Sequence, residues 1–356
     1  MAWDSSIDTK LQARITRSFT KLAQPFEITD VRQLAGDGGA RRYVRAHGRR
    51  GDQRATLAVA ILPRQQAEEV GSRGGNERFG LLARELAARG VRVPGIELWD
   101  PTEAIYIQED LGDTTLQLAM PGRSPAQRRT LYSRALEQMG RIAGLEQSYD
   151  LPSVDAELVR RELMHHLEEI LLHRKIAVSS GDLQRFETLV GAMSEALLAL
   201  PYAPAYRDFQ SRNLMVLPDE SLCVIDFQDA FRAPFTYDLI CLSRDSSLPL
   251  SDSDAQWIED QWLAAAPRAR GLDTAQIRAA IDLVGTQRNL KDSGRFAYFD
   301  RVNGKSGYLQ YIPRTARRAY AALERLDFPH AAWAADYLRR HSPFPPSAPE
   351  STSLLS

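Results

Sequence analysis

The chain has 356 residues, of which 44% are hydrophobic and 26% charged, and its formal net charge is −1. This is ordinary globular composition, and the length indicates two domains or lobes. The near-zero charge gives no polybasic signal for nucleic acid, and no run approaches the eighteen apolar residues of a membrane span. We therefore expect the protein to bind neither nucleic acid nor a membrane. The N-terminus lacks the basic-then-apolar pattern of a signal peptide, which predicts a cytoplasmic location.

The first third of the chain is predicted to be strand-rich. Apolar residues recur at helical spacing between Ile7 and Leu22, so residues 1–24 should contain an N-terminal helix. Residues 25–108 then alternate short β-type runs with Gly, Pro and charged turns, and form an expected N-lobe. Strands are expected at 26–34, 42–46, 55–62, 95–99 and 104–108, with one helix at 79–89.

The remainder of the chain has a mainly helical pattern. Residues 109–113 are a short polar hinge, and 114–341 are expected to form a larger C-lobe, in which Pro313 should bend or restart a helix. Residues 342–356 are rich in Pro and Ser and are expected to be a disordered tail. Helices are expected at 128–148, 155–175, 183–200, 236–242, 254–266, 274–299, 306–326 and 329–341.

A polar loop and the hairpin that follows it point to a chemistry. Asp208 and Asn213 stand five residues apart in the segment YRDFQSRN, and Asp226 ends the second strand of a predicted hairpin at 214–225. Kinase-type phosphoryl transfer uses one Asp to accept the substrate hydroxyl proton, and an Asn and a second Asp to hold magnesium. The sequence therefore predicts Asp208 as the catalytic base, Asn213 and Asp226 as metal ligands, and ATP and Mg²⁺ as cofactors. The alternative is a structural hairpin in which Asp208 only forms an Asx turn.

With the lobes and hinge around it, this motif resembles the aminoglycoside phosphotransferase and choline kinase group of small-molecule kinases, over roughly residues 25–340. The resemblance implies an α+β, two-lobed protein-kinase-like fold, and we expect a monomer that acts on a small-molecule substrate. Three stretches are most similar to bacterial anomeric kinases of N-acetylmuramate and N-acetylglucosamine, which implies a role in cell-wall sugar recycling. The stretches are 207–215, 225–230 with 234–239, and 307–309 before 313–314.

Two positions depart from the pattern of that group. Tyr206 stands where the group usually has His before the catalytic loop, and residues 22–174 contain no Lys to hold the phosphates from the third strand. The glycine-rich turn between two strands is the expected substitute, because glycine lets backbone N–H groups approach anionic oxygens and Arg adds charged donors. The alternative is a plain turn with solvated arginines. The candidates are Gly36, Gly38, Gly39, Arg41 and Arg42, with Arg45 or Arg64 as further possibilities.

The resemblance also implies roles for residues outside these motifs. The backbone of the hinge, at Glu109 and Leu111, would meet the adenine, and Asp238 would order the catalytic loop from a buried position. Besides Asp208, the candidates for acceptor binding are Arg212, Gln228, Asp229, Arg288 and Arg295. An Arg among them could read a substrate carboxylate. For Gln228 and Asp229 the alternative is loop capping, and for Arg288 and Arg295 it is a solvated helix face.

The sequence thus predicts an ATP-dependent phosphotransferase that acts on a hydroxyl of a small molecule, expected to be the anomeric hydroxyl of an amino sugar. One alternative is a kinase of aminoglycosides, choline or another amine, but residues 201–356 carry nearly equal numbers of acidic and basic residues, which does not favour a polycationic acceptor. The other alternative is a nucleotide-binding pseudokinase with a regulatory role, which the missing Lys and Tyr206 suggest.

Overall fold

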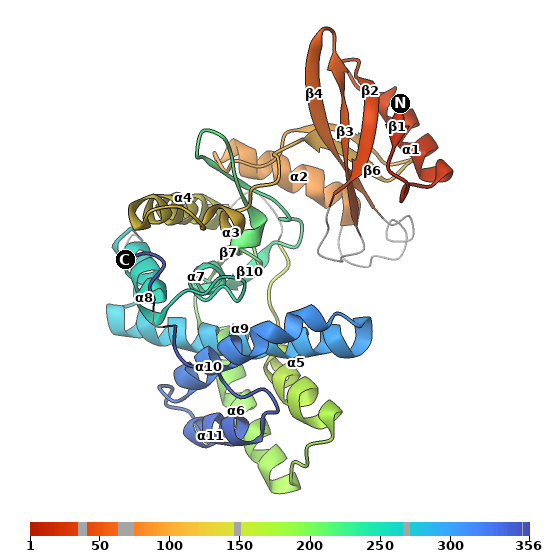
Figure 1. The fold of residues 1–356 in the computed structure, drawn as a ribbon. Helices are drawn as coiled ribbons and strands as arrows, with labels where there is room; N and C mark the ends of the chain where they lie inside the picture. The colour runs from red at the N-terminus through yellow and green to blue at the C-terminus, as the bar shows by residue number, and fades with distance from the viewer. Residues whose placement is uncertain (35–40, 63–74, 146–150, 266–270, 351) are drawn as a thin grey trace. The chain divides into compact units, whose positions relative to one another are not determined.

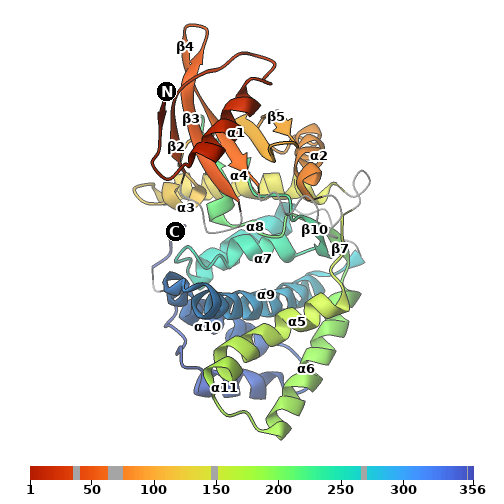
Figure 2. The same cartoon turned by 90° about the vertical axis from the view of Figure 1, so that its right-hand side faces the viewer.

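The computed structural model describes residues 1–34, 41–62, 75–145, 151–265, 271–350 and 352–356. The chain forms two compact units, one of Met1–Thr114 with Met215–Gln228 and the other of Thr115–Leu214 with Asp229–Ser356. The first unit is built mainly of strands and the second mainly of helices (Figures 1 and 2). The α+β fold class, with a strand-rich N-lobe and a helical C-lobe, is therefore confirmed.

A six-stranded sheet forms the centre of the first unit, in the order β1-β2-β3-β4-β6-β5. Its neighbours pair antiparallel except at the edge, where the two residues of β1 run parallel to β2. Side chains that alternate along β3, such as Val44 and Ala46, are fully buried, as a sheet with one covered face requires. The strands are β1 (Ala2–Trp3), β2 (Glu27–Gln33), β3 (Arg42–Arg50), β4 (Gln53–Ile61), β5 (Ile96–Asp100) and β6 (Ile105–Glu109).

The N-terminal helix α1 (Thr9–Phe19) belongs to this unit. It begins at Asp8, whose side chain accepts a hydrogen bond from the Leu11 N–H. Its apolar residues share one buried core with the strands, so the helix covers the inner face of the sheet. Helix α2 (Gly75–Ala88) and, from Met215 onward, the hairpin of β8 (Leu214–Val216) and β9 (Leu222–Val224) complete the unit. The hairpin thus groups with the N-terminal residues, whereas the sequence suggested a division at residue 114.

The second unit is arranged around one long helix, α9, which packs against α5, α6, α7 and α10 (Figure 2). Strands β7 (Tyr202–Ala205) and β10 (Phe231–Pro234) form a two-stranded antiparallel ladder, with residues 206–230 between them in the sequence. In the described parts of the chain, no helix has the length and apolarity to cross a membrane. The helices are α3 (Leu116–Ala119), α4 (Pro125–Ala143), α5 (Ala156–His166), α6 (Ser180–Ala199), α7 (Tyr237–Ser243), α8 (Asp252–Ala265), α9 (Thr274–Asn303), α10 (Ile312–Leu323) and α11 (Ala331–His341).

Two predicted long helices are interrupted. The one expected at 155–175 changes from α5 into the π-helical turn η2 (Leu167–Leu171) and then a 3-10 turn (Leu172–Arg174), which ends at Lys175 with φ of +61°. The one expected at 306–326 begins as the 3-10 turn η6 (Ser306–Tyr311), and α10 starts with Pro313 in its first turn. The expected restart at Pro313 is confirmed, because proline fits the first turn of a helix, where its missing N–H is not needed.

The C-terminal segment differs from the expectation of a disordered tail. In its described part, the Asp254 carboxylate accepts hydrogen bonds from the Ser353 hydroxyl and from the N–H groups of Leu354 and Leu355. Leu355 is buried, and Glu350 forms an ion pair with Arg314. Composition alone indicated disorder, but a buried acceptor on α8 holds the segment in place.

Candidate active site

The predicted catalytic base lies in a loop that a buried carboxylate holds by its backbone. Asp238, in the first turn of α7, accepts hydrogen bonds from the N–H groups of Tyr206 (2.6 Å) and Arg207 (3.1 Å). Arg207 has a φ of +87°, a backbone conformation that non-glycine residues rarely adopt. Tyr206 is buried and packs edge-on against Phe209. The expected buried Asp that orders the loop is therefore found, and Tyr206 supports the loop by packing.

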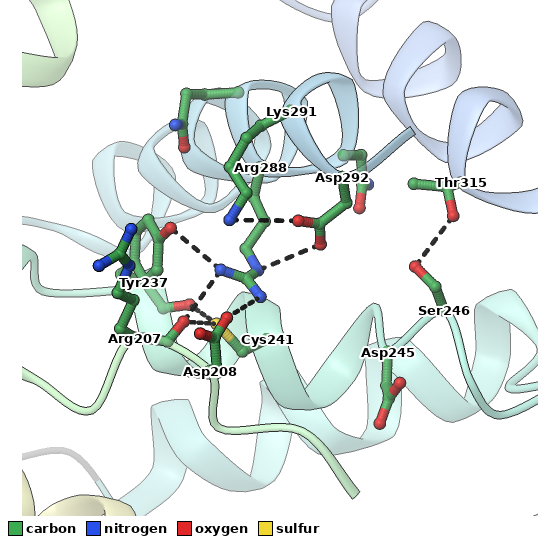
Figure 3. A network of polar contacts seen from close by, with 12 residues as sticks. Arg207, Asp208, Tyr237, Cys241, Asp245, Ser246, Arg288, Lys291, Asp292 and Thr315 are labelled. Atoms are coloured by element: carbon green, nitrogen blue, oxygen red, sulfur yellow. Dashed lines mark hydrogen bonds and ion pairs between the residues drawn. The ribbon is translucent and has the colours of Figure 1, made fainter. Parts of the chain in front are cut away.

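A buried arginine from α9 holds the same loop from another side (Figure 3). Arg288 donates hydrogen bonds to the Arg207 carbonyl (2.9 Å), to the Tyr237 hydroxyl (3.0 Å) and to Asp208 Oδ1 (3.0 Å). The Arg288 side chain is 2% exposed, whereas that of Asp208 is 43% exposed. The sequence suggested Arg288 for acceptor binding, with a solvated helix face as the alternative. In the structure Arg288 is buried and bonded to Asp208, so neither description fits it.

The charges around Asp208 keep it ionised. Burial raises the pKa of Asp208, but the positive charges of Arg288, Lys291 and Arg207 outweigh this effect and lower the pKa to about 2. Asp238 shows the opposite balance: burial raises its pKa to about 7 despite the two backbone hydrogen bonds it accepts. The carboxylate in the loop and the carboxylate on α7 thus differ in proton affinity, and Asp208 is the one that stays negative at neutral pH.

Asn213 ends a short turn that fixes its side chain. Its amide nitrogen donates to the Asp208 carbonyl at 2.8 Å, so the amide oxygen is the atom that could bind a cation. The turn η4 (Ser211–Asn213) is held by Asp245, which accepts hydrogen bonds from the N–H (2.7 Å) and hydroxyl (2.6 Å) of Ser211. Loop and turn therefore present Asp208 and Asn213 as one rigid pair within the second unit.

Asp226 belongs to the first unit, where the residue after it anchors the segment. Phe227 is fully buried and stacks on Phe79 of α2, with ring centroids 4.7 Å apart. Asp226 has a φ of +65°, and its side chain is 49% exposed. The amide nitrogen of Gln228 donates to Asp226 Oδ1 at 2.9 Å. An exposed carboxylate on a strained, anchored backbone is typical of a functional position, and Gln228 orients this carboxylate.

Arg41 lies beside Asp226, whereas Arg42 turns elsewhere. The Arg41 guanidinium is 3.6 Å from Asp226 Oδ1. Burial raises the pKa of Tyr43, and the positive charge of Arg41 opposes this only in part. Arg42 donates instead to the Gln33 side chain and to a backbone carbonyl. Of the two arginines, only Arg41 thus lies at a predicted magnesium ligand. The candidates Gly36, Gly38, Gly39 and Arg64 lie outside the described residues.

The side chains of the predicted hinge are engaged in ion pairs. Glu109 pairs with Arg92 and accepts a hydrogen bond from the Gly95 N–H (3.1 Å). Arg45 bonds to Asp110 (2.7 Å) and Asp113 (2.9 Å), which ties β3 to the hinge and removes this Arg from the candidates for phosphate binding. The half-buried Leu111 follows Asp110 in this fixed segment. Any contact of Glu109 or Leu111 with a base would thus use the backbone, as expected from the resemblance.

The remaining acceptor candidates lie at exposed or half-buried positions. Arg295 is exposed on α9, and its guanidinium lies over the rings of Tyr298 (5.0 Å) and Phe299 (4.7 Å). Asp229 is exposed and Arg212 half-buried.

Several residues that support the site were missed from the sequence. The Cys241 thiol donates to the Arg207 carbonyl at 3.2 Å, and Asp292 forms ion pairs with Arg288 (3.5 Å) and Lys291 (3.2 Å). One signal was available: Arg288, Lys291 and Asp292 follow an apolar run of a long helix, where charges must be buried in pairs.

The oxygen donors fit a hard cation. Magnesium prefers carboxylate, amide and phosphate oxygens, and usually takes only one or two ligands from the protein. Asn213 offers an amide oxygen fixed by its own nitrogen, and Asp226 an exposed carboxylate. Each of these residues, within its own unit, therefore offers an oxygen that suits magnesium.

Comparison with known proteins supports this chemistry. The model of the "Phosphotransferase enzyme family" matches residues 30–273. The chain is 29% identical over 299 residues to the N-acetylmuramate/N-acetylglucosamine kinase of Pseudomonas aeruginosa, covering 82% of this chain and 83% of that protein. It is 32% identical over 245 residues to the protein of the same name from Pseudomonas putida, covering 66% and 70%.

Solved structures share the fold. Choline kinase LicA from Streptococcus pneumoniae superposes with a TM-score of 0.59 at 12% identity, over 88% of this chain and all (100%) of that one. ADP-bound aminoglycoside phosphotransferase APH(2'')-Ib superposes with a TM-score of 0.54 at 13% identity, over 85% of this chain and 97% of that one. At this identity, the likeness establishes the two-lobed architecture and leaves the acceptor to other arguments.

Proposed function

Because the chain belongs to the phosphotransferase enzyme family and is a small-molecule kinase, we propose that it uses ATP and magnesium to phosphorylate the anomeric hydroxyl of an amino sugar. N-acetylmuramate and N-acetylglucosamine are the proposed acceptors, since two relatives that align with most of this chain carry these sugars in their names. Recycling of cell-wall sugars is the process that such a reaction would serve. The observation that carries the chemistry is the ionised, partly exposed carboxylate of Asp208, fixed in its loop by Asp238 and Arg288.

In the proposed reaction Asp208 aligns the acceptor hydroxyl and takes its proton. The hydroxyl oxygen forms a bond to the γ-phosphorus while the bond between that phosphorus and ADP breaks. With a pKa near 2, Asp208 is a weak base towards a ground-state hydroxyl. It therefore acts mainly by orienting the hydroxyl, and the proton moves as the bond to phosphorus forms and the hydroxyl becomes acidic.

Two features of this chain are proposed to balance the negative charge of the triphosphate: its magnesium ligands and one arginine. Asn213 and Asp226 are each proposed as a magnesium ligand, and magnesium neutralises phosphate charge when it is bound. Arg41, beside Asp226, would add a planar guanidinium that can bind two phosphate oxygens in place of the missing Lys. Arg212, Asp229 and Arg295 are retained as proposed acceptor contacts, and Gln228 is proposed to orient Asp226.

The test is an acceptor panel with a matched chemical control. Purified protein, ATP and magnesium are incubated with N-acetylglucosamine, N-acetylmuramate, choline or an aminoglycoside, and new phosphorylated products are measured by mass spectrometry. We expect phosphorylation of the two amino sugars and none of the methyl glycoside of N-acetylglucosamine, whose anomeric oxygen is blocked. Phosphorylation of the methyl glycoside would overturn the anomeric site, and turnover of only choline or an aminoglycoside would overturn the amino-sugar proposal.

The same panel separates a kinase from a pseudokinase. An inactive nucleotide-binding protein would be stabilised against thermal unfolding by ATP with magnesium and would phosphorylate no acceptor. Asp208→Asn serves as the control for contaminating kinases, because product formed by the wild type and equally by this variant does not come from this site.

A further inference from the structure

We propose that Arg288 is the positioning residue of the catalytic loop: from α9 it holds the Arg207 carbonyl and the Asp208 carboxylate in the geometry for phosphoryl transfer without touching the substrate. This inference rests on the proposed function, because it takes Asp208 as the proton acceptor. It assigns to Arg288 a role that differs from the acceptor-binding role expected from the sequence.

The contacts of Arg288 are those of an internal support. Its terminal nitrogens bind the Arg207 carbonyl, the Tyr237 hydroxyl and Asp208 Oδ1 at 2.9–3.0 Å, and its Nε lies 3.5 Å from Asp292 (Figure 3). These partners lie on several sides of one planar group, which fixes its orientation. At 2% exposure, the side chain has almost no surface to offer a substrate, whereas Asp208, at 43%, does.

The loop has a specific need for this support. With a φ of +87°, Arg207 has a strained backbone conformation that persists only where neighbouring groups impose it. Asp238 holds the N–H of Arg207, and Arg288 holds its carbonyl oxygen. Arg207, the residue before the catalytic base, is thus fixed at both its N–H and its carbonyl. The carbonyl also accepts a hydrogen bond from the Cys241 thiol.

The charge of Arg288 is balanced inside the protein. A buried guanidinium without a counter-charge would be strongly unfavourable. Asp208 and Asp292 supply two negative charges, and Lys291 pairs with Asp292 at 3.2 Å. The network therefore keeps Arg288 in place before any substrate arrives, as a positioning role requires.

The experiment compares variants of Arg288 with a matched arginine on the same helix. Arg301, also on α9, forms a two-pronged ion pair with the buried Glu169 at 2.9 and 2.7 Å. Arg288→Ala, Arg288→Lys and Arg301→Lys are assayed for kcat, for KM of ATP and acceptor, and for melting temperature. Arg288→Ala is assayed again with 20–50 mM guanidinium, a range of concentrations chosen to avoid denaturation. Hydrogen exchange of the peptide over residues 204–210 is followed by mass spectrometry.

For Arg288→Ala we expect kcat to fall on the order of 10²-fold, the effect of a misplaced catalytic group, with both KM values within about twofold of the wild type. Lys should restore part of kcat, because it can satisfy only some of the hydrogen bonds, and guanidinium should raise the kcat of Arg288→Ala. Exchange at 204–210 should be faster in both Arg288 variants and unchanged in Arg301→Lys, which should keep wild-type kcat.

Three results would overturn the inference. These are wild-type kcat in Arg288→Lys with no rescue of Arg288→Ala, a change in acceptor KM with unchanged kcat, and a loss of kcat in Arg301→Lys equal to that in Arg288→Lys. If Arg288→Ala does not fold, the inference is tested by the kcat of Arg288→Lys and by its hydrogen exchange at residues 204–210. A wild-type protein that phosphorylates no acceptor contradicts the proposed function instead, and exchange at 204–210 still tests the support of the loop.

Discussion

The guanidinium of Arg41 lies 3.6 Å from the carboxylate of Asp226, and both residues belong to the strand-rich unit. A cation fixed beside a proposed magnesium ligand is well placed to share the phosphates that the magnesium would bind. Arg42, the next residue, donates instead to Gln33 and to the Ser6 carbonyl. The two neighbouring arginines thus form a matched pair for an experiment.

Arg41→Ala is expected to raise KM for ATP at least several-fold with little change in KM for the acceptor. The reason is the loss of a guanidinium that binds phosphate oxygens in the absence of a strand Lys. Arg41→Lys should recover only part of the affinity, because a point charge cannot make a two-pronged contact. Steady-state kinetics with Arg42→Ala as the control measure this, and equal effects of both alanine variants would assign the phosphate contact to neither arginine in particular.

Asp226→Ala is expected to abolish the magnesium-dependent part of the stabilisation by ATP. A ligand raises the melting temperature only through the folded state that it binds, and this variant lacks an anionic oxygen for the cation. Melting is measured with ATP plus magnesium and with ATP plus EDTA. Gln228→Ala, which removes a hydrogen bond to Asp226 but leaves its carboxylate in place, should keep most of the difference between the two conditions. A wild-type difference in Asp226→Ala would exclude this residue as a ligand.

Asp208→Asn keeps the size of the side chain and removes the proton acceptor. We expect turnover to fall on the order of 10²–10⁴-fold, the range for loss of general acid–base catalysis. The melting-temperature shift with ATP should be retained, because the nucleotide does not depend on this carboxylate in the proposed site. Near-normal turnover would refute the assignment of Asp208.

The chemistry of the site could be predicted from the sequence because its motif is local. Asp208 and Asn213 are five residues apart, and the structure joins them by one hydrogen bond within that span. The contact of Arg288 with Asp208 joins residues 80 positions apart, and the pattern of α9 can indicate buried charges but not which distant residue Arg288 contacts. Sequence reasoning therefore named Arg288 as a site residue but gave it a different partner.

In the fold, too, the elements set by nearby residues could be predicted, whereas those that depend on distant contacts could not. The strands from β2 to β6 and the restart at Pro313 follow from alternation, turn residues and proline chemistry. The order of residues 352–356 could not be predicted, because it depends on Asp254, about 100 positions earlier in the chain. The placement of α1 on the sheet likewise depends on a shared core, which local spacing cannot reveal.

His166 is predicted to make the folded protein less stable below pH 6.5. It is buried where α5, α9 and α10 meet, 2.6 Å from the Ser293 hydroxyl and 2.8 Å from the Tyr320 hydroxyl, and burial lowers its pKa to about 3. The unfolded chain, with a His pKa of about 6.5, binds the proton first, so stability is complete above pH 6.5 and falls as the pH drops towards 3, by about 1.4 kcal/mol per unit. Between pH 7 and pH 5 the free energy of unfolding should fall by about 2 kcal/mol because of His166. Urea unfolding should show this loss in the wild type, and His166→Gln should not show it. His341→Gln, at an exposed position, should behave like the wild type, and the same pH dependence in all three proteins would contradict the prediction.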